Sequence, residues 1–183
     1  MLSINHKEQL ITQINQGLTP KYLFFWGHSQ SPTGEVTKSC LSQWYESSFT
    51  IDGLRYLTAE HYMMAQKARL FADDATFSQI MACSHPNEAK QLGRMVKNFD
   101  AQVWENHRFE IVVQGNLAKF SQNPALKAFL LATGTRVLVE ASPVDNIWGI
   151  GLAQDHAHAQ QPHHWRGLNL LGFALMVVRE KLC

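Results

Sequence analysis

Two short β-prone runs on either side of Asp52-Gly53 place the strongest local constraint on the fold of this chain. In SSFTIDGLRYLT, residues 47–58, the Asp-Gly pair suits a two-residue hairpin turn because both residues can adopt positive φ. The run YLFFWG, residues 22–27, is short, aromatic and closed by glycine, as expected of a buried strand. RVLVEA, residues 136–141, is a further predicted strand. The sequence therefore predicts a small sheet that includes an N-terminal hairpin.

Most of the remaining chain carries helix signals. Predicted helices begin at Thr58, at Ser84 with Pro86, near Val103, at Asn123 with Pro124, and at Asn169. The second should end near Lys97 and the third near Phe120, and Gly134 should end the fourth. With 183 residues, of which 45% are hydrophobic, the chain is an ordinary size for one domain. We predict a mainly helical α+β domain over residues 21–183, preceded by an N-terminal extension, residues 1–20, to which we assign no function.

Charge and cysteine content narrow the class of protein. A net charge of +1 gives no support for bulk affinity for nucleic acid or anionic membranes. It does not exclude a local pocket that binds phosphate. Cys40, Cys83 and Cys183 are widely spaced and odd in number, which favours reduced thiols. The N-terminal segment lacks the apolar core of a signal peptide, and no later run reaches membrane-spanning length. We expect a cytoplasmic protein without a membrane partner, and the sequence predicts no oligomeric state.

The helix TAEHYMMAQKARLF, residues 58–71, carries polar groups on an otherwise apolar side. At 100° per residue, Glu60 and Lys67 share one stripe with Met64 and Phe71. Two helical turns separate Glu60 from Lys67 by about 10 Å, which is too far for an ion pair but suits the two sides of a small polar ligand. In the alternative reading, Glu60 complements the helix N-terminus and Lys67 extends to solvent. Periodicity leaves both readings open.

The histidines do not form a recognisable metal motif. His156, His158, His163 and His164 occupy a polar loop and lack a helical i, i+4 ligand pair. Such a loop is usually solvated. We therefore expect no metal and no other cofactor.

Four segments, read together, resemble the YbiA-like, or NADAR, family of N-glycosidases. They are CLSQWYESSFTIDGLRYLTAEHYMMAQKARLF, LGRMVKNFDAQVWENHRFEIV, ASPVDNIWGIGL and WRGLNLLGFALMVVREKL, and the resemblance runs from about Tyr22 to Leu182. Members cleave the bond between a base and ribose, in phosphorylated riboflavin-pathway intermediates or in ADP-ribosylated guanine. The resemblance implies the same class of reaction and a phosphorylated ribosylamine as a small-molecule substrate.

The resemblance also implies roles for particular residues. Cleavage passes through an oxocarbenium-like centre, which calls for carboxylates near C1 of the ribose. Glu60 and Asp145 are the expected catalytic pair, and the helix dipole should favour the charged form of Glu60. Trp104 and Trp148 would hold the base or sugar, although a lone helical tryptophan is more often part of a core. Gly149, in WGIG, would let backbone approach the ligand, although glycines are common in turns.

Basic residues would bind the phosphate. The expected set is Lys67, Arg94, and Arg166 with Asn169 at the start of the last helix. For each cation the alternative is an ordinary solvated side chain. Lys38 is a candidate for a transient imine with an opened sugar.

One segment departs from the family pattern. Where many relatives read approximately SNFYPAPF, this chain has SQWYESSF, with Gln43 and Trp44 in place of Asn and Phe. If the segment lines the base pocket, the resemblance fixes the class of reaction but leaves the choice of substrate open. Two alternatives remain: a hydrolase that removes ADP-ribose from guanine in nucleic acid, and a module that binds ADP-ribose or nucleotides without turnover.

Overall fold

The computed structural model describes residues 4–183. In chain order, the helices, 3-10 helices (η) and strands are α1 (Lys7–Asn15), β1 (Tyr22–Phe25), η1 (Lys38–Leu41), β2 (Phe49–Ile51), β3 (Leu54–Tyr56), α2 (Ala59–Leu70), α3 (Asp74–Ala82), α4 (Pro86–Arg94), α5 (Ala101–Gln122), α6 (Pro124–Ala132), β4 (Val137–Glu140), η2 (Pro162–His164) and α7 (Leu170–Leu182). The predicted α+β class, mainly helical with few strands, is confirmed. Within the described residues, no helix combines the length and the hydropathy needed to cross a membrane.

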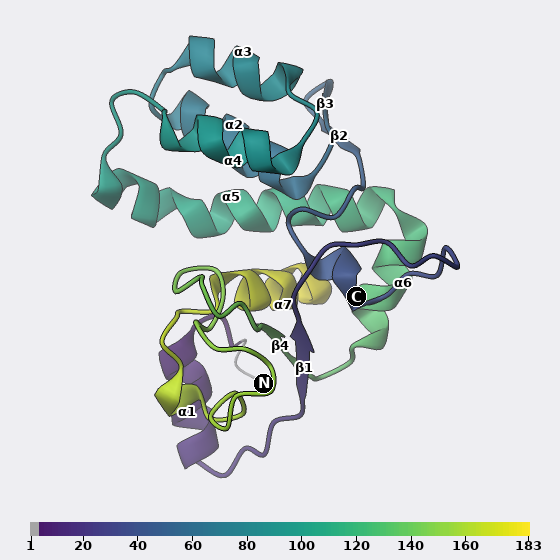
Figure 1. Ribbon diagram of the computed structural model, residues 1–183. Coiled ribbons are helices and arrows are strands. Elements are labelled where there is room, and N and C mark those ends of the chain that lie inside the picture. The colour runs from purple at the N-terminus through teal and green to yellow at the C-terminus, as the bar shows by residue number, and fades with distance from the viewer. Residues whose placement is uncertain (1–3) are drawn as a thin grey trace.

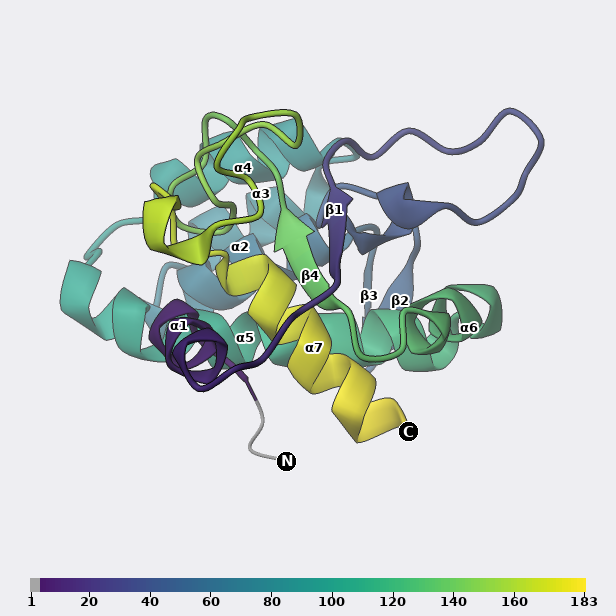
Figure 2. The ribbon, with the colours of Figure 1, turned by 90° about the horizontal axis from the view of Figure 1, so that it is seen from below.

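Helix α5 runs through the middle of the molecule and separates two groups of elements (Figure 1). On one side lie α2, α3, α4 and the β2–β3 hairpin, and on the other lie α7 and the β1–β4 pair (Figure 1). Helix α1 lies beyond α7 and contributes Leu10, which is completely buried, to the core. Figure 2 shows α7 running diagonally past the strands, and α7 packs against β4.

The strands form two separate pairs. Strands β2 and β3 are antiparallel around Asp52 (φ 51°) and Gly53 (φ 77°), so the predicted hairpin is confirmed. Strands β1 and β4 are parallel, with Tyr22 opposite Val137 and Phe25 opposite Glu140. Because parallel strands end at the same edge, the segments that follow Phe25 and Glu140 leave the pair side by side.

Several helix boundaries differ from the prediction. Helix α4 begins after His85, whose Nδ1 accepts the N–H of Asn87 at 3.1 Å, rather than after Ser84, and it ends at Arg94 rather than near Lys97. Helix α3 was not predicted. Its N-cap is Asp73, whose Oδ1 accepts the N–H of Thr76 at 3.1 Å.

Two glycines allow neighbouring helices to approach α2 closely. A Cβ on Gly93 of α4 would collide with the side chain of Met64, and a Cβ on Gly115 of α5 would collide with the ring of Tyr62. Met64 and Tyr62 both belong to α2, which is therefore fixed between α4 and α5. Close packing on both sides gives the first turn of α2 a defined position.

Candidate functional site

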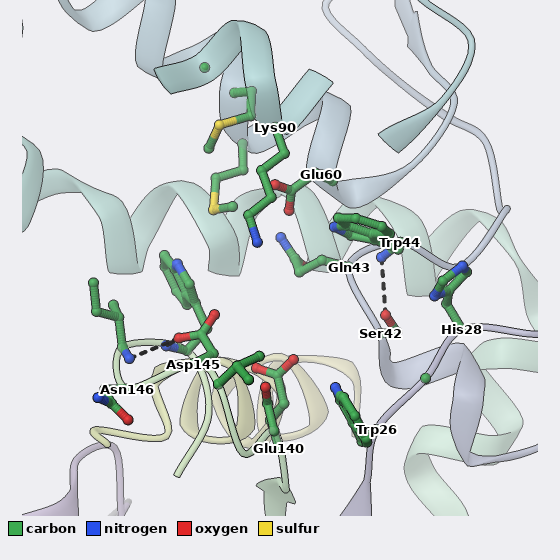
Figure 3. Close-up of a pocket in the computed structure, with 18 of the residues that line it drawn as sticks. Trp26, His28, Ser42, Gln43, Trp44, Glu60, Lys90, Glu140, Asp145 and Asn146 are labelled. Atoms are coloured by element: carbon green, nitrogen blue, oxygen red, sulfur yellow. Dashed lines mark hydrogen bonds between the residues drawn. The ribbon is translucent and has the colours of Figure 1, made fainter. Parts of the chain in front are cut away.

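A cavity of about 830 Å³ lies where the two groups of elements face each other. One wall comes from α2 and α4, and it carries Glu60 and Lys90 (Figure 3). The opposite wall follows the ends of the parallel strands and carries Trp26, Glu140 and Asp145 (Figure 3). The parallel pairing of β1 with β4 therefore builds one side of the cavity.

Glu60 projects into this cavity from the first turn of α2. Thr58 caps the helix by accepting the N–H of His61 at 3.2 Å, as predicted. Glu60 is only 4% exposed, and burial raises the pKa of its carboxyl to about 7. Lys90 lowers this pKa and Asp145 raises it. The sequence predicted that the helix dipole would favour the charged form of Glu60. The loss of hydration on burial has the larger effect on the pKa, so the neutral form is favoured instead.

Glu140 was missed by the sequence analysis. It is the last residue of β4, it lines the cavity, and its Oε2 is buried without a hydrogen-bond partner among residues 4–183. Burial, followed by the nearby carboxyls of Asp145 and Glu60, raises the pKa of Glu140 to about 8, while Lys90 acts to lower it. The available signal was a lone carboxyl at the end of a strand, the position at which parallel strands place functional groups.

Asp145 lies in the loop that follows β4. Its Oδ1 accepts the N–H groups of Ile147 at 2.8 Å and Trp148 at 2.7 Å, so the carboxylate both organises the loop and borders the cavity. Gly149 allows this loop to fold back, because a Cβ there would lie 2.9 Å from the carbonyl oxygen of Glu140. The close approach at Gly149 is therefore to the protein's own strand β4.

Three cations line the same cavity, of which Lys67 and Arg94 were predicted and Lys90 was missed. Lys67 is half-buried, and burial, followed by the neighbouring Arg94, lowers the pKa of its ammonium group, while Glu60 raises it. The Nζ of Lys67 lies 4.5 Å from the ring centre of Phe99 and 5.6 Å from that of Trp104. Glu60 and Lys67 thus lie on one wall, in agreement with the stripe on α2.

Aromatic side chains complete the cavity. Trp148 lines it as predicted, together with Trp26 and Trp44, which were not assigned a role. Trp26 is 60% exposed, so its ring is available at the mouth. Trp104 belongs to the hydrophobic core, and its ring lies beside Lys67, which lines the cavity. The position of Trp104 therefore agrees with the alternative reading, in which a helical tryptophan is part of the core.

Other predicted residues lie elsewhere. Lys38 is exposed and donates to Gln154 Oε1 at 3.1 Å. Arg166 is exposed. Asn169 is completely buried in the left-handed region (φ 54°), and its side chain bonds to β4 instead of capping α7: Nδ2 donates to the carbonyl of Leu138, and Oδ1 accepts the N–H of Glu140, both at 2.9 Å. Asn169 therefore holds the strand that carries Glu140.

The histidine loop lies apart from the cavity. The rings of His158 and His164 stack with centroids 4.4 Å apart, and His156 lies 5.5 Å from His158. In residues 4–183, no group of three or more His, Cys, Asp and Glu side chains has an arrangement that could hold a metal ion.

Comparison with known proteins identifies the family. The model of the NADAR domain matches residues 24–183, which include every residue of the cavity. The chain belongs to the NADAR family. An N-glycosidase of Acanthamoeba polyphaga mimivirus is 46% identical over 168 residues, covering 89% of this chain and 97% of the viral protein.

YbiA of Escherichia coli resembles this chain in both sequence and structure. N-glycosidase YbiA of Escherichia coli is 35% identical over 132 residues, covering 72% of this chain and 74% of YbiA. The solution structure of E. coli YbiA superposes with a TM-score of 0.71 at 29% identity, covering 90% of this chain and 86% of YbiA. The NADAR fold observed here is therefore also that of YbiA.

Proposed function

We propose that this protein hydrolyses the N-glycosidic bond of phosphorylated riboflavin-pathway intermediates, 5-amino-6-ribosylamino-pyrimidinedione 5′-phosphate and its diamino precursor, and releases ribose 5-phosphate. Family membership makes it a hydrolase that acts on N-glycosyl compounds. The observation that carries the proposal is the convergence of Glu60, Glu140 and Asp145 on one cavity. We place the protein in the cytoplasm, which agrees with the free thiols of its three cysteines.

The three carboxyl groups can divide the work of hydrolysis. Glu140, with a pKa of about 8, carries a proton at neutral pH and can deliver it to the departing nitrogen. Glu60, with a pKa of about 7, is ionised in a large fraction of molecules and can accept a proton from the attacking water. Asp145 can stabilise positive charge at C1 of the ribose. Different acid strengths within one cavity separate the acid from the base.

The cations suit the phosphate. Lys67 and Arg94 line the cavity on the side of α2 and α4, where they can bind the phosphate of the substrate. The predicted imine role of Lys38 does not fit its exposed position beside Gln154. If the sugar opens, an amine inside the cavity is required, and Lys67, whose pKa is lowered by burial, has that property.

The test compares the two substrate classes on purified protein. Released ribose 5-phosphate or ADP-ribose is followed by mass spectrometry, with the ribosylaminopyrimidine phosphates in one arm and ADP-ribosylated guanine in the other. We expect a higher kcat/KM for the pyrimidine substrates. A clear reversal would assign the protein to the guanine reaction, and binding without release would indicate a module without turnover.

A further inference from the structure

Gln43 carries an amide nitrogen that is buried and unpartnered at the wall of the cavity. The side chain is 6% exposed and lines the cavity, and its Nε2 has no hydrogen-bond partner within the described part of the chain. Buried polar groups in folded proteins nearly always have partners, and an exception calls for an explanation.

Neighbouring groups fix the orientation of the Gln43 amide. The carbonyl of Val112 can only accept, so the group of Asn116 that faces it at 2.9 Å must be the donor Nδ2. The same nitrogen donates to Gln43 Oε1 at 2.7 Å. The amide oxygen of Gln43 is therefore engaged, and the nitrogen is directed away from Asn116.

The backbone of Gln43 is also held beside α2, the helix that carries Glu60. Its carbonyl accepts the N–H of Glu60 at 3.0 Å. In Figure 3 the nitrogen-bearing ends of Gln43 and Lys90 point toward the same part of the cavity. Both groups are donors and neither can accept from the other. An acceptor atom supplied by a ligand would satisfy both.

The neighbouring ring indicates which part of a ligand lies there. Trp44 follows Gln43 in the chain, also lines the cavity, and provides an aromatic surface of the kind on which planar bases stack. Lys90 Nζ lies 5.7 Å from the centre of the Trp44 ring, so a base beside this ring would have its edge near Lys90 and Gln43. In pyrimidinediones and in guanine that edge bears carbonyl oxygens, which accept hydrogen bonds.

We propose that Gln43 Nε2 and Lys90 Nζ donate hydrogen bonds to a ring carbonyl oxygen of the departing base. This inference rests on the proposed function. When the C1–N bond breaks, its electron pair moves to the nitrogen and spreads to the conjugated carbonyl oxygen. Glu140 protonates the nitrogen, while water adds its oxygen to C1 and passes a proton to Glu60. The two donors stabilise the charge that develops on the base.

The test separates binding of the base from binding of the sugar phosphate. In Gln43→Leu, kcat/KM should fall about 10- to 100-fold through loss of one donor to a charged acceptor. Inhibition by the free diaminopyrimidinedione, or by guanine if that substrate class is used, should weaken by a similar factor. Inhibition by ribose 5-phosphate should stay within two-fold. Gln114→Leu, the same change at an exposed position of α5, is the control and should leave all three unchanged.

A second variant tests the orientation of the Gln43 amide through Asn116, a residue that does not line the cavity. Asn116→Leu removes the donor to Gln43 Oε1 and offers no hydrogen bond in its place, so the Gln43 amide is no longer held with its nitrogen toward the cavity. Base inhibition should weaken as in Gln43→Leu, with ribose 5-phosphate inhibition retained.

Three results would overturn the proposal. Base inhibition of Gln43→Leu could remain within two-fold of the parent, ribose 5-phosphate inhibition could weaken instead, or both could weaken equally. If the parent protein hydrolyses neither substrate, the proposed function fails. In that case calorimetry measures the affinity of the parent and of Gln43→Leu for the free base. Weaker binding by Gln43→Leu supports the role of Gln43, and equal binding contradicts it.

Discussion

Two buried carboxyl groups in one cavity differ in acid strength because their surroundings differ. Burial is the main cause of the raised pKa at both Glu60 and Glu140. At Glu60 the effect is offset by Lys90, by the side chain of Trp44 and by Arg94, while Asp145 adds to it. Glu140 has the charges of Asp145 and Glu60 beside it, and Lys90 is the cation that offsets them. The residue that is easier to ionise is thus the one closer to compensating groups.

Glu60→Gln should reduce kcat by about 10²- to 10⁴-fold, the range for loss of a positioned general base. The substitution retains the volume and removes a buried group that can ionise, so the melting temperature should not fall. Glu88→Gln changes an exposed glutamate in the first turn of α4 and should leave kcat unchanged. A large drop in melting temperature with near-parental kcat would return Glu60 to a structural role and leave Asp145 and Glu140 as the candidate carboxyls.

The pH dependence of kcat/KM should be bell-shaped. Activity should rise near pH 7 as Glu60 loses its proton and becomes a base, and fall near pH 8 as Glu140 loses the proton that it must donate. Because the two carboxyls interact, the measured values belong to the pair. Glu140→Gln should lower kcat by about 10²- to 10⁴-fold and abolish the alkaline limb. An unchanged alkaline limb in this variant would assign the proton donor elsewhere.

At the scale of elements, Lys119 of α5 fixes the segment that carries Gln43 and Trp44. Its side chain is completely buried, and its Nζ donates to the carbonyls of Cys40 at 2.7 Å and Ser42 at 2.8 Å. Burial lowers the pKa of this lysine to about 7. A long helix thereby anchors η1 and the cavity residues that follow it.

Lys119→Met should lower the free energy of unfolding by about 1–3 kcal/mol, because two buried carbonyls lose their donor. It should also raise KM more than it lowers kcat, since Gln43 and Trp44 would lose their anchor while the catalytic carboxyls stay in place. Denaturant unfolding and steady-state kinetics measure both effects. Lys181→Met, at an exposed position of α7, is the control. Parental stability and KM in Lys119→Met would contradict the anchoring role.

Elements with local signals could be predicted from the sequence, and the others could not. Asp52-Gly53 and Thr58 act on residues next to them, so the hairpin and the start of α2 were predicted. The cap at Asp73 was an equally local signal that was overlooked. For Glu140 the sequence offered only a lone carboxyl at the end of a predicted strand, because its place in the cavity depends on the pairing of β4 with β1, which no local pattern encodes. Asn169 likewise bonds across the chain instead of within its own helix.

At the scale of the whole molecule, the cavity lies between two groups of elements that contribute different chemistry. The α2–α4 side supplies Glu60 and the cations, and the β1–β4 side supplies Glu140, Asp145 and the exposed ring of Trp26. Helix α5 contacts both α2 and α7 and sets their separation. The distance between the two walls of the cavity is therefore set by α5.

The parallel pairing of Tyr22–Phe25 with Val137–Glu140 has a consequence for how the enzyme is made. The ribosome synthesises the hairpin and α2 to α6 before it reaches β4, and α7 follows β4. Strand β1 must therefore wait, without its partner, while most of the chain emerges. Closing so long a loop is entropically costly and slow. A nascent chain can bury much of α2 to α5 early, yet it acquires the Glu140 wall, and with it a complete cavity, only after β4 has emerged.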